Sequence, residues 1–399
     1  MIQQQTQIFP SFSSEEYQRR HQAVWAEMEK RHLDGLVVYG DSGSHSGNQA
    51  NIFYLTGYRD PLFSYVLVPL GQEPILIMSN ELYLPHAKTM AVVKNVDWVT
   101  WNPPERVAVE LKRLKLDRAR LGLVGLRGIQ KSTLPHEHVE GLRSALPNAT
   151  LEDATEILQQ IRRIKSNEEI EWLRKGAELT DATVVALEQE AKEGMTELQL
   201  AGIIAKTCYG LNGDQRVSFI GATSMDDPQI IFPRQEPSHR KLQKGDVVLT
   251  ELSSSYSGYA GQIHRPLVVS SKPTQAYQEI FEVAKETYQR VLGAMGPGKT
   301  DEDVRRAAAP IKEKGFWTFD ALVHGWGLSI EPPRLDLFEI ALIKRPQEPI
   351  VFKPGMCMVV QPHVLSADKR RGLQIGSLVL VTETGAEALQ KYPMKFVEI

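Results

Sequence analysis

The feature that most constrains the fold of this chain is a pattern of two helices followed by a strand, which occurs twice in its second half. Residues 194–197 (Gly-Met-Thr-Glu) and 298–301 (Gly-Lys-Thr-Asp) each follow a long amphipathic segment and begin another one. Residues 242–251 and 352–361 each combine a glycine turn with an apolar strand and end, at the same offset, in Glu251 and Gln361. A repeated unit of this kind indicates two halves packed together, with these two side chains at matching places beside a cleft.

The first part of the chain alternates short apolar runs with helical stretches. Residues 35–39, 65–68, 74–78 and 121–125 are apolar and bounded by Gly, Pro or Asp, which predicts strands of an α/β sheet. Ser166 followed by Glu169 has the spacing of a capping box at the start of a long helix. We therefore predict an α/β (α+β) chain with an N-terminal domain over residues 1–155 and a second domain over residues 156–399.

Composition excludes several classes of protein. The 399 residues contain 46 Lys and Arg against 49 Asp and Glu, a near balance that argues against nucleic-acid or membrane binding through bulk charge. Two cysteines, Cys208 and Cys357, exclude a disulfide scaffold. The N-terminal residues lack the features of a signal peptide, and no run of about 18 apolar residues is present. We expect a cytoplasmic protein with no nucleic-acid or membrane partner.

Seven segments, in this order, resemble the creatinase / prolidase / aminopeptidase P family. They are residues 51–58 (Asn-Ile-Phe-Tyr-Leu-Thr-Gly-Tyr), 162–170 (Arg-Arg-Ile-Lys-Ser-Asn-Glu-Glu-Ile), 194–197 (Gly-Met-Thr-Glu), 245–249 (Gly-Asp-Val-Val-Leu), 324–328 (His-Gly-Trp-Gly-Leu), 354–356 (Pro-Gly-Met) and 379–383 (Val-Leu-Val-Thr-Glu). The resemblance covers nearly the whole chain. It implies a creatinase-type N-terminal domain, a C-terminal pita-bread domain with an internal pseudo-two-fold repeat, and a homodimer.

The resemblance also implies a site for two metal ions held by Asp, Asp, His, Glu and Glu. These positions fall on Glu251, Gln262, His324, Gln361 and Gly376. Two divalent cations need several carboxylates to offset their charge, and this set offers one. We therefore expect no metal and no cofactor, although a single cation on Glu251 and His324, joined by His264 or His363, stays open.

The same mapping assigns roles to the residues around the cleft. His324 and His264 would move protons, and Glu251 would orient a water molecule or take its proton. Gln262 and Gln361 would hold the substrate. Further candidates for binding the small-molecule substrate are His363, Arg371 and, in the N-terminal domain, Tyr58, which would cap the cleft of a neighbouring subunit.

These residues lead to one main hypothesis and three alternatives. The main hypothesis is a metal-independent hydrolase that cleaves a C–N bond of a small polar substrate, with a non-peptide amide or amidine favoured over a peptide. The alternatives are an Xaa-Pro aminopeptidase or dipeptidase with an altered metal site, a lyase, and a peptide-binding module without catalysis.

Overall fold

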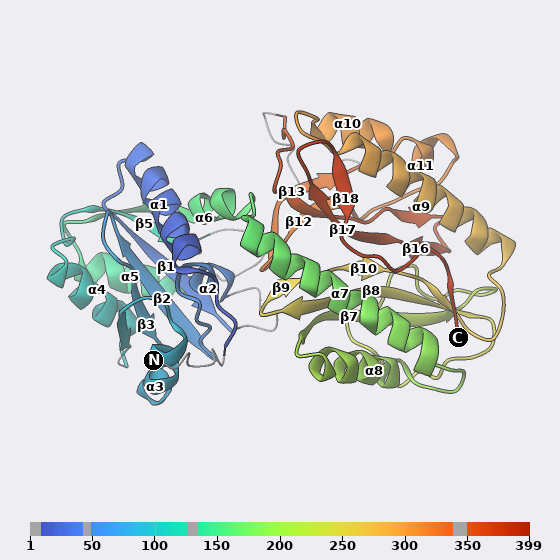
Figure 1. Cartoon of the computed structure of the whole chain (residues 1–399), viewed down its shortest axis with the longest axis horizontal. Helices are drawn as coiled ribbons and strands as arrows, with labels where there is room; N and C mark the ends of the chain where they lie inside the picture. The colour runs from blue at the N-terminus through green and yellow to red at the C-terminus, as the bar shows by residue number, and fades with distance from the viewer. Residues whose placement is uncertain (1–8, 43–48, 100, 127–133, 338–348) are drawn as a thin grey trace, which may run out of the picture. The chain divides into compact units, whose positions relative to one another are not determined.

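The computed structural model describes residues 9–42, 49–99, 101–126, 134–337 and 349–399. The chain forms two compact units, unit 1 (residues 1–162) and unit 2 (residues 163–399), which Figure 1 shows. The sequence analysis placed the boundary earlier, after residue 155. Helix α6 (Thr155–Arg162) packs against α1 (Ser14–Lys30) and β5 (Arg120–Val124), and it therefore belongs to unit 1.

The described part of unit 1 contains a six-stranded sheet in the order β4-β3-β2-β1-β5-β6. Its other strands are β1 (Gly35–Asp41), β2 (Phe63–Pro69), β3 (Ile75–Met78), β4 (Asn95–Trp98) and β6 (Thr150–Asp153). Its other helices are α2 (Ala50–Thr56), α3 (Leu84–Met90), α4 (Pro103–Arg113) and α5 (His136–Ala145), with a short 3-10 turn η2 (Glu81–Tyr83). The four apolar runs of the sequence are thus strands β1, β2, β3 and β5.

Unit 2 is built on a larger mixed sheet, whose main path in the described residues is β13-β12-β14-β17-β10-β8-β11-β19. The long strands are β7 (Asp214–Ser224), β8 (Asp246–Tyr256), β12 (Ala321–Trp326), β13 (Ile330–Asp336), β14 (Cys357–Val360) and β17 (Gly376–Val381). The short strands are β9 (Tyr259–Ala260), β10 (Ile263–His264), β11 (Leu267–Val268), β18 (Ala386–Ala388) and β19 (Val397–Glu398), with β15 (His363–Leu365) and β16 (Gly372–Gln374) forming a separate hairpin. The helices are α7 (Asn167–Glu190), α8 (Glu197–Gly210), α9 (Gln275–Ala294), α10 (Asp301–Ala307) and α11 (Pro310–Glu313).

The repeat predicted from the sequence is present in unit 2. Helices α7 and α8 lead into the antiparallel pair β7 and β8, and helices α9 and α10 lead, through α11, to β12 and its antiparallel partner β14. Gly245 and Gly355, at the turns before β8 and β14, both have a φ of 85°, which favours glycine. Ser166 is the N-cap of α7 and forms the predicted capping box, in which its hydroxyl accepts a hydrogen bond from the Glu169 backbone amide.

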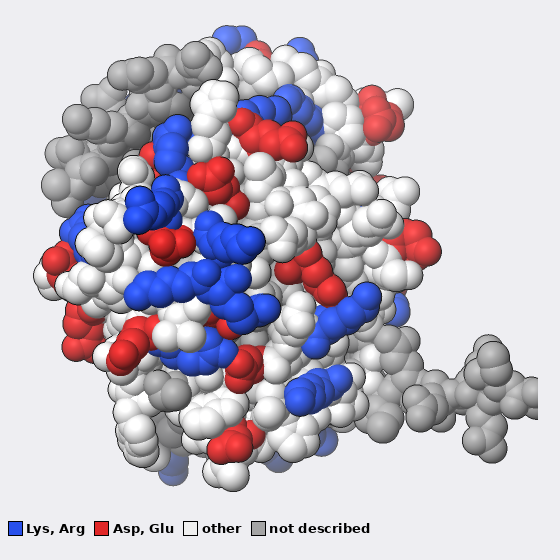
Figure 2. All heavy atoms as spheres, turned by 90° about the vertical axis from the view of Figure 1, so that its left-hand side faces the viewer, with Lys and Arg blue, Asp and Glu red and all other residues white. Residues whose placement is uncertain are grey.

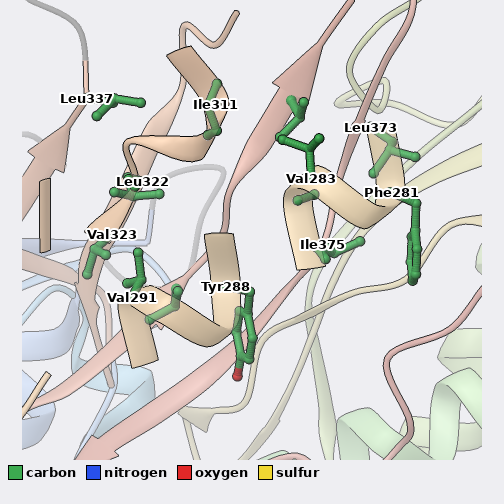
Figure 3. Close-up of a cluster of buried hydrophobic side chains, with 14 of the residues drawn as sticks. Phe281, Val283, Tyr288, Val291, Ile311, Leu322, Val323, Leu337, Leu373 and Ile375 are labelled. Atoms are coloured by element: carbon green, nitrogen blue, oxygen red, sulfur yellow. The ribbon is translucent and has the colours of Figure 1, made fainter. Parts of the chain in front are cut away.

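Each half of unit 2 has its own apolar core. In the first half, side chains of α7 and α8 such as Leu187 and Ile204 pack on Val248 of β8. In the second half, one face of α9 packs on strands of the sheet, and Figure 3 shows Val291 beside Val323 in this cluster. Strand β8 contributes to both clusters, with Val248 in the first and Val247 and Leu249 in the second.

The charged side chains of the surface are mixed in sign. On the face in Figure 2, Lys and Arg side chains lie among Asp and Glu side chains. Surface ion pairs such as Arg143–Glu140 and Arg120–Glu152 illustrate this mixing. None of the helices within the described ranges is long and apolar enough to cross a membrane.

Close packing between α7 and the β8–β10 segment gives the first prediction. A Cβ atom on Gly176 would lie 2.4 Å from the Tyr259 carbonyl oxygen and 2.9 Å from the Gly261 amide nitrogen. We expect Gly176→Ala to lower the free energy of unfolding by about 1–3 kcal/mol, because backbone atoms must move to admit the methyl group. Urea denaturation measures this change.

Gly202 provides the matched control, since it lies in α8 and a Cβ there would meet no atom within 4 Å. Gly202→Ala should stabilise the protein by up to about 1 kcal/mol, because alanine favours the helix. Equal effects of the two substitutions would contradict the packing described for Gly176.

Candidate active site

Five neighbouring strands of unit 2 bring the predicted ligand positions together. In the sheet order β12-β14-β17-β10-β8, His324 lies in β12, Gln361 follows β14 and Gly376 begins β17. Gln262 directly precedes β10, and Glu251 lies in β8. The two halves of the repeat therefore supply one continuous row of positions across the centre of the sheet.

Four of these side chains form a hydrogen-bonded network. Gln262 Nε2 donates to Glu251 Oε1 at 2.9 Å and lies 3.5 Å from Gln361 Oε1. His324 Nε2 lies 3.1 Å from the same Gln361 oxygen. The amide of Gln361 thus joins the carboxyl side of the site to the imidazole side.

The network continues to Asp320, which the sequence analysis missed. Gln361 Nε2 and Gln374 Nε2 donate to Asp320 Oδ2 at 3.0 and 2.9 Å, and Arg334 lies 3.8 Å from Asp320 Oδ1. Asp320 precedes β12 and Gln374 ends β16, so neither occupies one of the five family positions. An acidic residue directly before the apolar strand of His324 was the available signal for Asp320.

Burial controls the protonation of Glu251. Desolvation, followed by the negative charge of Asp320, raises its pKa to about 8, while the hydrogen bond from Gln262 opposes the shift. At neutral pH this carboxyl group is therefore largely protonated in the folded protein. A carboxyl group with a pKa in this range can accept or donate a proton near physiological pH.

The histidines of the site favour the neutral form. Desolvation lowers the pKa of His264, His324 and His363, most strongly for His264. His324 Nδ1 and Nε2 face the carbonyl oxygens of Gly325 and Gln361. A neutral ring can donate a proton to only one of these two acceptors at a time.

His264 is fully buried beside the carboxyl group. Its Nε2 lies 3.9 Å from Glu251 Oε2, and neither ring nitrogen has a hydrogen-bond partner among the residues that the structure describes. The neighbouring Arg265 donates to carbonyl oxygens that include those of Gly376 and Tyr392. The Glu251 carboxyl group is thus left to the network.

His363 lies next to the network but on a separate hairpin. Pro362 interrupts the alternation between Gln361 and His363, since proline has no amide proton for the ladder, and β15 begins at His363. His363 Nε2 lies 2.8 Å from the Ile231 carbonyl oxygen, and the rings of Phe232 and Phe319 meet it edge to face. This histidine borders an aromatic cluster.

Two further residues were predicted to bind the substrate. Arg371 lies at the end of the β15–β16 turn, directly before β16, and forms a 3.8 Å ion pair with Asp368, which is exposed. Tyr58 is buried in unit 1, where its ring contacts His86. Within the described ranges, no hydrogen bond or ion pair connects Arg371 to Glu251, Gln361 or Asp320. The role of Tyr58 at the cleft of a neighbouring subunit stays a prediction.

The residues at the five positions do not fit the pair of metal ions that the resemblance implies. Among the described residues, no group of three or more His, Cys, Asp or Glu side chains is placed to hold a metal ion. A side chain at position 376 has no room, because a Cβ there would lie 2.4 Å from the Val360 carbonyl oxygen and 2.9 Å from His264 Nδ1. The amide nitrogens of Gln262 and Gln361 donate hydrogen bonds to Glu251 Oε1 and Asp320 Oδ2, so each of these carboxyl oxygens already has a partner other than a cation.

The raised pKa of Glu251 predicts a stabilising substitution. Above pH 4.5 the unfolded chain gains stability by ionising this residue, while the folded protein keeps it protonated up to about pH 8. Glu251→Gln removes this cost, so we expect a gain of at most about 3 kcal/mol at pH 7. Thermal unfolding of both proteins measures the difference.

The pH dependence of this comparison serves as the control. The difference in stability between Glu251→Gln and wild type should shrink as the pH falls toward 4.5, where wild-type Glu251 becomes protonated in the unfolded as well as the folded state. A Glu251→Gln protein that is less stable than wild type at pH 7 would show that the carboxyl group is ionised and well paired in the folded protein.

Comparisons with known proteins match both units. Residues 20–164 match the creatinase/prolidase N-terminal domain, and residues 171–383 match the metallopeptidase family M24. An Xaa-Pro dipeptidase of Pyrococcus furiosus is 28% identical over 372 residues, which cover 91% of this chain and 98% of that protein. An Xaa-Pro dipeptidase of Pyrococcus horikoshii is 25% identical over 91% of this chain and 94% of its own length.

Solved structures show the same fold. The prolidase from Pyrococcus horikoshii OT3 matches with a TM-score of 0.77 and 22% identity, covering 95% of this chain and all of that one. The X-Pro aminopeptidase from Thermotoga maritima matches with a TM-score of 0.79 and 18% identity, over 95% of this chain and 99% of that one. These matches confirm the predicted creatinase-type and pita-bread domains.

The comparisons also correct the main functional hypothesis. The relatives are Xaa-Pro dipeptidases of a metallopeptidase family, so the expectation of a metal-independent hydrolase acting on a non-peptide C–N bond was wrong. That expectation was based on the charge of the residues at only five positions, whereas the similarity to the Pyrococcus furiosus Xaa-Pro dipeptidase extends over nine-tenths of the chain. The chain belongs to the metallopeptidase family M24, a family of hydrolytic peptidases.

Proposed function

We propose that this protein hydrolyses the Xaa-Pro bond of short peptides. The observation that carries the proposal is its similarity to the Xaa-Pro dipeptidase of Pyrococcus furiosus across 98% of that protein's length. The site agrees with a peptide as substrate, since a buried row of amide, carboxyl and imidazole groups matches the donors and acceptors of a peptide bond.

Glu251 is the residue that we assign to the proton transfers. Peptide hydrolysis needs a group that takes a proton from water and a group that returns one to the leaving nitrogen. Glu251 titrates in the range where one carboxyl group can do both. Its Oε1 accepts a hydrogen bond from Gln262, and its Oε2 lies 3.9 Å from His264 Nε2.

Gln361 and His324 are assigned to positioning. The Gln361 amide is fixed between His324 Nε2 and Asp320 Oδ2, at 3.1 and 3.0 Å, so its orientation is set from both sides. Fixed dipoles that need no reorganisation during the reaction are more effective than mobile ones. Asp320 would then act through Gln361 rather than on the substrate carbonyl group.

The direct test is turnover of Leu-Pro with Leu-Ala as the matched control. Parallel reactions contain either EDTA or Mn²⁺, and the leucine released from each dipeptide is quantified by mass spectrometry. We expect cleavage of Leu-Pro in at least one condition and a loss of roughly 100-fold or more in kcat/KM for Glu251→Gln. Cleavage of neither dipeptide in either condition would overturn the proposal.

The pKa of Glu251 gives a separate prediction for pH dependence. Because the ionised carboxylate takes the proton of water, kcat/KM should rise with pH through about 8. Asp320→Asn removes the neighbouring negative charge and should move this rise to lower pH. A rise at the same pH in both proteins would contradict the assignment of Glu251.

A further inference from the structure

The network leaves two buried carbonyl oxygens without donors. Gln262 Oε1 and Gln374 Oε1 have no hydrogen-bond partner among the described residues, although both side chains are almost completely buried. Buried amide oxygens are nearly always paired, so an unpaired one indicates a partner that the protein itself does not supply. Each belongs to an amide whose nitrogen is fixed on a carboxylate, Gln262 on Glu251 and Gln374 on Asp320.

The Asp320 end of the network can accept a further positive charge. The charged partner described for Asp320 is Arg334, which lies 3.8 Å from Asp320 Oδ1 and is partly shared with Asp336. Buried carboxylates are costly unless a cation or several donors offset them.

We infer that this network binds an organic ammonium group at its Asp320 end, with Gln374 Oε1 and the Asp320 carboxylate as its acceptors. This inference rests on the proposed function, because the ammonium group it names is the free amino terminus of a short peptide.

The chemistry of the acceptors favours ammonium over a metal ion. An ammonium group offers three N–H donors to acceptors at ordinary hydrogen-bond distances, and it accepts neutral amide oxygens as partners. A divalent pair instead requires several carboxylate oxygens converging at about 2.0–2.6 Å. Here one oxygen of each carboxylate already accepts from an amide N–H, and the unpaired atoms are amide oxygens.

The neighbouring residues indicate what the ammonium group is attached to. Phe319 directly precedes Asp320, is 47% exposed, and packs its ring on His363 with 4.9 Å between ring centroids. An apolar side chain next to the acidic end of the network suits a ligand whose ammonium group carries an apolar substituent. An amino-terminal leucine has this character.

The test uses leucinamide and N-acetyl-leucinamide, which differ in the ammonium group and contain no Xaa-Pro bond. Calorimetric titration of the full-length protein in EDTA should show that leucinamide binds and that its acetylated form binds roughly 10- to 100-fold more weakly. Asp320→Asn should weaken leucinamide binding by a similar factor. Gln374→Leu removes an acceptor without changing charge and should also weaken it, which tests the inference if Asp320→Asn does not fold.

Asp227→Asn is the matched control, since Asp227 is an exposed carboxylate paired with Arg370, and it should leave the affinity unchanged. Equal affinity for the two ligands, or unchanged affinity in folded Asp320→Asn and Gln374→Leu proteins, would overturn the inference. Because neither ligand is a substrate, selective binding of leucinamide without Leu-Pro cleavage would reject only the proposed function. Leu-Pro cleavage without that selectivity would reject only this inference.

Discussion

The site depends on one side-chain amide, that of Gln361. Gln361 Oε1 lies 3.1 Å from His324 Nε2 and 3.5 Å from Gln262 Nε2, while Gln361 Nε2 donates a hydrogen bond to Asp320. Glu251 and Gln262 come from the first half of the repeat, and His324, Asp320 and Gln361 come from the second. The strands of both halves meet through β10 and β17, so this amide is where the polar groups of the two halves become one network.

The sequence predicted the fold because its signals are local. The glycine turns at Gly245 and Gly355 and the capping box at Ser166 act within a few residues, and each is present in the structure. It also predicted that Glu251 and Gln361 lie at matching positions of a repeat. Asp320 and Gln374 were not predicted because they join the site through contacts between residues far apart in the sequence. Gln374 lies on the β15–β16 hairpin, which follows Pro362 and the end of β14, and it contacts Asp320 and the Gln361 backbone.

The function was harder to predict than the fold for a related physical reason. A ligand set can be judged residue by residue, but the charge of a buried site is a property of all its members. Asp320 adds a second carboxylate that helps to raise the pKa of Glu251, and the unpaired oxygens of Gln262 and Gln374 add acceptors. Together they form an acidic, acceptor-rich site in a chain whose relatives cleave Xaa-Pro dipeptides.

A crystal structure of the Glu251→Gln protein with Leu-Pro bound would test the central claim, that this network holds a peptide by its amino terminus beside position 251. The account predicts an intact dipeptide whose ammonium nitrogen lies within hydrogen-bond distance of the Asp320 carboxylate and of Gln374 Oε1. A dipeptide bound with its amino terminus away from Asp320, or bound outside the network, would contradict it.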